Sequence, residues 1–202
     1  MKKKLLALLL AAVAVVSCFA ACGKSNVSDG NASDTNVSEE NSVSASSQAE
    51  EKSPFFADFE TTALDGKTYT QEAFTGNRLT MVNIWGTFCA PCIREMPDLE
   101  KLSKDYAGKG LAIVGIVGDT FDYLDKANDT AKIDLAKDIV KDTGVTYLNL
   151  LPSPTLNTAK LDYIRSFPTT YFLNEKGELL GEYIGSRSYD QWAEIIDSLL
   201  AE

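Results

Sequence analysis

The sequence predicts an α/β fold in which a strand–helix–strand unit is followed by a strand–strand–helix unit around one sheet. Two apolar runs, 79–85 and 111–117, are typical of buried strands, and a helical pattern lies between them at 93–106. Two further strand patterns, 169–174 and 178–184, precede an amphipathic C-terminal helix. Because a helix connects the first two strands, we expect them to be parallel.

Shorter elements complete the prediction. Residues 57–61 and 67–70 flank Asp65-Gly66, a dipeptide that favours a hairpin turn, so we expect an N-terminal β extension. A helix with caps at both ends is expected from Asn128 or Asp129 to Gly144, within an insertion at 119–145. This helix is expected to cover the sheet, and a part in choosing partners is left open.

Composition limits the function. The chain has 202 residues, a net charge of −10, four cysteines and no histidine. An acidic chain is not expected to bind nucleic acid, and the lack of histidine excludes Ser-His and Cys-His catalysis. We expect one globular domain, 54–202, that acts as a monomer.

The N-terminus is typical of an exported lipoprotein. Residues 1–21 contain a charged start and the apolar run Leu5–Val16, which is short for a membrane-spanning helix. Residues 19–23, Phe-Ala-Ala-Cys-Gly, resemble a bacterial lipobox, so Cys22 is the expected lipidation site after cleavage. Cys18 is the alternative site, and a plain secretory signal also remains open.

The segment that follows is predicted to be a disordered tether. It is rich in Ser, Asn, Asp, Glu and Ala and has no aromatic residue, so it buries too little apolar area to fold. Thirty such residues reach roughly 30 Å on average. Residues 22–53 are therefore expected to join a lipid anchor to the domain.

Cys89 and Cys92 are the one pair of reactive side chains at a spacing that supports chemistry. Cys89 is expected at a strand-to-helix turn, where backbone N–H groups and the helix dipole stabilise a thiolate. The pKa of such cysteines falls from about 8.5 to about 3.5–7.5. Cys92 lies one helical turn further on and is expected to be more buried. Cys89 is therefore the predicted nucleophile and Cys92 the resolving thiol.

Two other interpretations of the pair are weaker. A zinc site needs three or four protein ligands, and the chain has neither histidine nor a second CxxC motif. A structural disulfide stabilises most when it closes a long loop, and this pair closes almost none. We therefore expect a redox-active disulfide that needs no cofactor and no metal.

Five segments, in order, resemble the TlpA/ResA family of membrane-tethered thioredoxin-like thiol-disulfide oxidoreductases. They are Phe55–Phe59, Leu64–Lys67, Val82–Thr87, Arg94–Pro97 and Phe167–Thr170. The chain departs from the family at Phe88, where Trp is usual, and in a longer connection between Gly118 and Gly144. These departures affect the expected substrate preference more than the chemistry.

The resemblance implies a thioredoxin-like fold over 54–202 and protein disulfides as substrates. It also implies a position on the outer face of the bacterial cytoplasmic membrane and a membrane electron donor of the CcdA/DsbD type. Family clients are apocytochrome c or an extracellular methionine sulfoxide reductase, and the sequence does not choose between them.

Pro168 is predicted to follow a cis peptide bond, because the thioredoxin fold places a proline opposite the CxxC motif. The Phe167 main chain would then face an extended substrate segment beside Cys89. The residues expected to form the substrate surface are Trp85, Phe88, Ala90, Pro91 and Phe167. Trp85 is expected to pack beneath the site and shield it.

Glu95 is the third predicted catalytic residue after the two cysteines. Thioredoxins carry a buried Asp at the position of Asn83 as the proton acceptor for the second cysteine, and an amide cannot take that role. The TlpA/ResA family has a functional Glu at the position of Glu95, one helical turn beyond Cys92. Burial and a nearby thiolate should raise its pKa. A solvated surface glutamate is the alternative.

The sequence therefore predicts a reductase of protein disulfides, and other functions remain open. A disulfide oxidase or isomerase would differ in reduction potential. A peroxiredoxin-like peroxidase would have Thr where this chain has Gly86. A solute-binding lipoprotein would share the signal and the tether but usually has two larger lobes.

Overall fold

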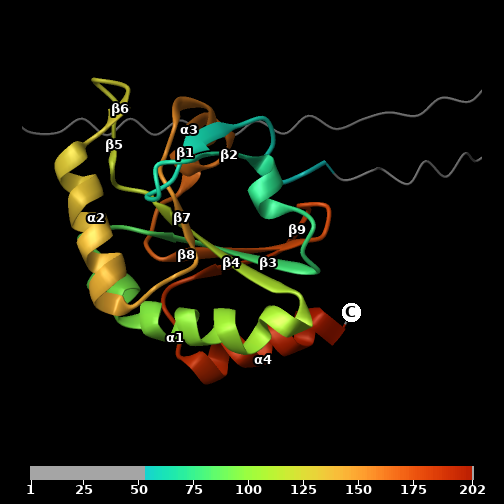
Figure 1. Cartoon of the computed structure of the whole chain (residues 1–202). Helices are drawn as coiled ribbons and strands as arrows, with labels where there is room; N and C mark the ends of the chain where they lie inside the picture. Colours follow the sequence, from blue (N-terminus) through green and yellow to red (C-terminus); the bar gives the residue numbers. More distant parts are fainter. Residues whose placement is uncertain (1–52, 202) are drawn as a thin grey trace, which may run out of the picture. The chain divides into compact units, whose positions relative to one another are not determined.

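The central sheet has five strands in the order β7-β4-β3-β8-β9 (Figure 1). They are β3 (Leu79–Trp85), β4 (Leu111–Val117), β7 (Leu148–Leu150), β8 (Thr169–Asn174) and β9 (Leu179–Ile184). β4 pairs in parallel with both β3 and β7, whereas β8 is antiparallel to both β3 and β9. This topology confirms the predicted order of units and the parallel pairing of the first two long strands.

The computed structural model describes residues 53–201. The predicted signal peptide, the lipidation site and nearly all of the tether lie outside this range. Within it, no helix is long and apolar enough to cross a membrane.

Helices and short hairpins surround the sheet. The α-helices are α1 (Ala90–Tyr106), α2 (Thr130–Thr143), α3 (Pro154–Ala159) and α4 (Tyr189–Ala201), and the 3₁₀ helices are η1 (Gln71–Phe74), η2 (Ala107–Lys109) and η3 (Leu161–Tyr163). The hairpins are β1 (Glu60–Thr62) with β2 (Thr68–Thr70), and β5 (Phe121–Asp122) with β6 (Ala127–Asn128). Helices α1 and α4 cover one face, and the β1–β2 hairpin with α3 covers the other (Figure 1).

The two faces of β3 enter different hydrophobic cores. Leu79, Met81 and Trp85 pack with apolar residues of α1 and α4. Val82 and Ile84 pack on the opposite face. Their neighbours there include Phe56, Phe59 and Phe74, and Leu156 of α3. Every residue of β3 is buried, which explains why the strand is a nearly continuous apolar run in the sequence.

Helix α2 is the crossover between the parallel strands β4 and β7. Parallel neighbours cannot be joined by a tight turn, so this connection needs a helix. Asp129 caps its start by accepting a hydrogen bond from Ala131 N at 2.8 Å, and Gly144 ends it in the left-handed region at φ 72°. Both predicted caps are therefore confirmed. The predicted insertion 119–145 is thus largely a connection that the sheet requires, and it also contains the unpredicted β5–β6 hairpin.

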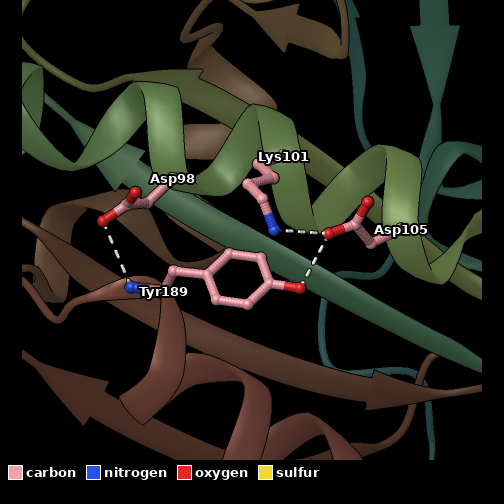
Figure 2. Close-up of polar contacts among 4 residues, drawn as sticks. All are labelled: Asp98, Lys101, Asp105 and Tyr189. Atoms are coloured by element: carbon pink, nitrogen blue, oxygen red, sulfur yellow. Dashed lines mark hydrogen bonds and ion pairs between the residues drawn. The ribbon is translucent and has the colours of Figure 1, made fainter.

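Polar contacts fix the start of α4 against α1 (Figure 2). Tyr189 N donates to Asp98 Oδ2 at 3.1 Å, and its hydroxyl donates to Asp105 Oδ2 at 2.7 Å. Lys101 Nζ lies 2.8 Å from the same Asp105 oxygen and 3.6 Å from the centre of the Tyr189 ring. Exposed contacts of this kind are individually weak, so their main effect is to orient α4.

A buried hydrogen bond joins the end of β3 to β7. Trp85 Nε1 donates to Asn149 Oδ1 at 2.9 Å, and Asn149 Nδ2 donates to Tyr147 O at 3.0 Å. Gly115 of β4 lies beside Asn149, and a Cβ at Gly115 would overlap the Asn149 side chain. A glycine is therefore required at this point in the middle of the sheet.

We predict that Gly115→Ala lowers the free energy of unfolding by about 1–3 kcal/mol, because the added methyl group overpacks the sheet. Gly108→Ala is the matched control, since a Cβ at Gly108 meets nothing within 4 Å. The control should change stability by less than about 0.5 kcal/mol. Urea denaturation of both variants measures the difference, and equal losses would contradict the steric argument.

Candidate active site

Cys89 lies at the turn between β3 and α1, as predicted. It is the N-cap residue of α1, and its Sγ accepts a hydrogen bond from Cys92 N at 3.3 Å. Pro91 occupies the first turn of the helix, where a missing N–H costs no helical hydrogen bond. The helix therefore directs a donor and the positive end of its dipole towards the Cys89 sulfur, which favours a thiolate there.

Cys89 and Cys92 form a disulfide, with their Cα atoms 5.3 Å apart. Cys89 is 6 % exposed, whereas Cys92 is fully buried. Cys89 is thus the cysteine that a partner can reach. In the described range, no group of three or more His, Cys, Asp and Glu side chains is placed to hold a metal ion.

A carboxylate braces the turn that leads into Cys89. Asp119, just after β4, accepts hydrogen bonds from Thr87 N at 2.9 Å and from Thr87 Oγ1 at 2.6 Å. Lys132 of α2 donates through Nζ to Asp119 O at 2.7 Å. Because β3 and β4 are parallel, their C-terminal ends meet at one edge of the sheet. The sequence did not indicate this brace, since Thr87 and Asp119 are 32 positions apart.

Glu95 is buried at 3 % exposure, one turn beyond Cys92 on α1. Each carboxyl oxygen accepts one hydrogen bond. Oε1 accepts from Asn83 Nδ2 at 3.1 Å, and Oε2 accepts from Arg187 N at 3.0 Å. The carboxyl therefore joins α1 to β3 and to the segment before α4, and it is not a surface glutamate.

Burial raises the pKa of Glu95 above its ordinary value, which is the predicted direction. The Arg187 N–H opposes this rise, followed by the Asn83 amide, because both donors favour the carboxylate. The Trp192 indole acts weakly in the same direction, although its Nε1 has no hydrogen-bond partner among residues 53–201. Burial thus favours the neutral carboxyl, and the two donors favour the carboxylate.

Asn83 orients Glu95 instead of titrating itself. Its Nδ2 also donates to Thr170 Oγ1 at 3.1 Å, so both amide hydrogens are used. Its Oδ1 has no hydrogen-bond partner within residues 53–201. The sequence identified Asn83 only as a residue that cannot accept a proton, and its contact with Glu95 emerges from the packing of β3 against α1.

The loop before β8 forms the other side of the site. The Phe167–Pro168 peptide bond is cis, as predicted. The Phe167 ring packs against Phe88, with ring centres 5.8 Å apart. A Cβ would lie 2.9 Å from the Phe167 ring at Gly118 and 3.2 Å from it at Gly86. Because Gly86 and Gly118 have no Cβ, the Phe167 ring can pack closely against both and line the same hollow as Cys89.

A hollow of about 540 Å³ opens beside Cys89. Its lining residues are Phe88, Cys89, Ala90, Pro91, Ile164, Arg165, Ser166 and Phe167. Phe88 is 72 % exposed, so much of its apolar ring is open to solvent at the rim of the hollow. The predicted surface residues thus line this hollow, except for Trp85. Trp85 is fully buried, which fits packing and shielding and not direct contact with a substrate. The part contributed by 164–166 was not predicted.

A family model described as Redoxin matches residues 48–188. The chain is 31 % identical to thioredoxin-like protein YneN of Bacillus subtilis over 142 residues, which are 69 % of this chain and 75 % of YneN. It is 29 % identical to thiol-disulfide oxidoreductase ResA of Halalkalibacterium halodurans over 139 residues, which are 69 % of this chain and 72 % of ResA.

Among solved structures, the chain is similar to a thiol:disulfide interchange protein of the thioredoxin family from Chlorobium tepidum TLS. The two share 26 % identity and a TM-score of 0.59, over 74 % of this chain and 97 % of that one. These similarities confirm the ResA-like family and the thioredoxin-like fold that the sequence predicts. The matched segment contains Cys89, Cys92, Glu95 and Pro168, and it spans more than half of the sequence. The chain therefore belongs to the Redoxin family.

Proposed function

We propose that this protein is an extracytoplasmic thiol-disulfide oxidoreductase that acts mainly as a reductase of protein disulfides. One observation carries the proposal: a CxxC pair lies at a helix N-terminus, with Cys89 lining a surface hollow and Cys92 buried behind it. Relatives named thiol-disulfide oxidoreductase ResA and thiol:disulfide interchange protein DsbE support the same class of chemistry.

The reaction begins when the Cys89 thiolate attacks one sulfur of a client disulfide. This step forms a mixed disulfide and releases the other client sulfur as a thiolate. Cys92 then gives up its proton and attacks Cys89 Sγ, which forms the Cys89–Cys92 disulfide and releases the second client thiolate. Two electrons pass from the dithiol to the client, so the proposal needs no cofactor.

Glu95 and the Pro168 loop assist these steps. Glu95 accepts the proton of Cys92, because it is the buried carboxyl one turn away and Asn83 can only donate to it. None of the hydrogen bonds within residues 53–201 uses the Phe167 N–H or C=O. The Phe167 main chain is therefore free to pair with an extended client segment beside Cys89.

The cellular setting is also part of the proposal. An acyl group on Cys22 anchors the protein to the outer face of the cytoplasmic membrane, and residues 22–53 tether a monomeric domain. A membrane thiol transporter of the CcdA/DsbD type reduces the oxidised pair again. Clients of the apocytochrome c or methionine sulfoxide reductase type fit this setting.

The direction of electron flow can be tested by the reduction potential of the Cys89–Cys92 pair at pH 7. A reductase should have a potential near that of thioredoxin, about −270 mV. Titration against dithiothreitol, followed by thiol alkylation, measures it. A potential near that of DsbA, about −120 mV, would make the protein an oxidase and overturn the proposed direction.

We predict that Cys92→Ser accumulates mixed disulfides with clients, whereas Cys89→Ser does not. Without the buried thiol the first intermediate cannot resolve, and without the accessible thiol it cannot form. Non-reducing gels of the two variants, with and without dithiothreitol, show the adducts. Equal amounts of adduct in both variants would refute the assigned roles.

We predict that Glu95→Gln folds and slows turnover near pH 7 by roughly 10²-fold, the lower end of the range for removing a general base. The Asn83 amide can turn its Oδ1 towards the new amide group, so a hydrogen bond between these two side chains can be retained. In the wild type, the resolving step should slow as the pH falls through the raised pKa of Glu95, because a protonated carboxyl accepts no proton. The variant should lack this acid limb.

Rates of thiol alkylation and of client reduction against pH measure this effect. Glu194→Gln, at an exposed position on α4, is the matched control and should follow the wild-type curve. Superimposable curves for the wild type and Glu95→Gln, together with equal turnover, would remove Glu95 from the mechanism and leave water as the proton acceptor.

A further inference from the structure

A second hollow adjoins the one beside Cys89. It has a volume of about 390 Å³ and shares Ile164, Arg165 and Phe167 with the first hollow. Its other lining residues are Ile84, Gly118, Tyr123, Leu161 and Asp162. The two hollows are therefore neighbours that share the wall formed by Ile164, Arg165 and Phe167.

Arg165 is the charged residue of the first hollow, and no carboxylate lines that hollow. Its Nη1 donates to the main-chain oxygen of Asp162 at 2.8 Å, and it forms no ion pair with any carboxylate in the described range. The net charge of −10 on the whole chain opposes an acidic partner, so a preference for one must come from this local guanidinium. An exposed guanidinium without a counter-ion beside the nucleophile therefore favours an acidic group on the partner.

The second hollow has a mainly polar lining, in which Asp162 is the acidic residue. Asp162 Oδ1 accepts a hydrogen bond from the hydroxyl of the exposed Tyr123 at 2.8 Å. Within the described range, the Asp162 carboxylate forms no ion pair with Arg165.

We propose that the hollow beside Cys89 binds a client segment that has an acidic residue next to the client cysteine. That acidic residue lies against the Arg165 guanidinium. The inference rests on the proposed function, because the client cysteine at Cys89 sets the register.

Peptide disulfides provide the test for the charge preference. Each peptide carries one cysteine bonded to thionitrobenzoate, with Asp or Lys next to the cysteine on either side, and release of the coloured thiol gives the rate. At low salt the reduced wild type should prefer Asp over Lys by roughly two- to fivefold, the range for an exposed ion pair. High salt should remove the preference.

Two variants locate the charge effect. Arg165→Gln should abolish the preference for Asp over Lys. Lys176→Gln should keep it, because this exposed lysine lies in the turn after β8, at the opposite end of that strand from Pro168. Comparing the two peptides within each variant cancels any effect on the reactivity of Cys89 itself. An unchanged preference in Arg165→Gln would overturn the proposal.

The same assay distinguishes a failure of this inference from a failure of the proposed function. If the wild type reduces all the peptides at equal rates, the proposed function stands and the proposed preference for an acidic residue is wrong. If it reduces neither the peptides nor an uncharged aromatic disulfide, the proposed function itself fails.

Discussion

The complete burial of β3 is the constraint on which the rest of the structure depends. The strand is paired on both edges and covered on both faces, so its polar side chains can pair only with other protein groups. Among residues 53–201, Thr80 Oγ1 and Asn83 Oδ1 have no such partner. Asn83 meets Glu95 and Thr170, and Trp85 meets Asn149. One strand thus positions the buried carboxyl of the site, fixes β7 at the sheet edge and delivers the chain to Cys89.

Burial of the Glu95 carboxyl costs free energy when that carboxyl is charged. Burial raises the pKa of Glu95 in the folded state, so folding is favoured when Glu95 is protonated. The contribution to stability is present at low pH and is lost as the pH rises through the folded-state pKa. The Arg187 and Asn83 donors reduce this loss without removing it. A fold selected for stability alone would place an apolar side chain here, so the cost is consistent with a role in proton transfer.

Two parts of the chain form the hollow beside Cys89. The turn into α1 supplies Phe88, Cys89, Ala90 and Pro91, and the loop before β8 supplies residues 164–167. Phe167 links the two parts because Gly86 and Gly118 leave room for its ring. Residues 164–166 can therefore change without altering the CxxC motif itself.

The sequence by itself determined the order of the main strands and helices, the CxxC pair at a helix start and, through family resemblance, the cis Pro168 and the buried Glu95. These features depend on spacing within one element or on a contiguous motif. The tertiary structure alone decided which residues support them, such as Asp119, Asn149 and Arg165. Hydrogen-bond partners 32 or 64 positions apart leave no periodic signal, and the two-residue strands β5 and β6 are too short to produce one. Such contacts exist only once the sheet brings distant strand ends to one edge.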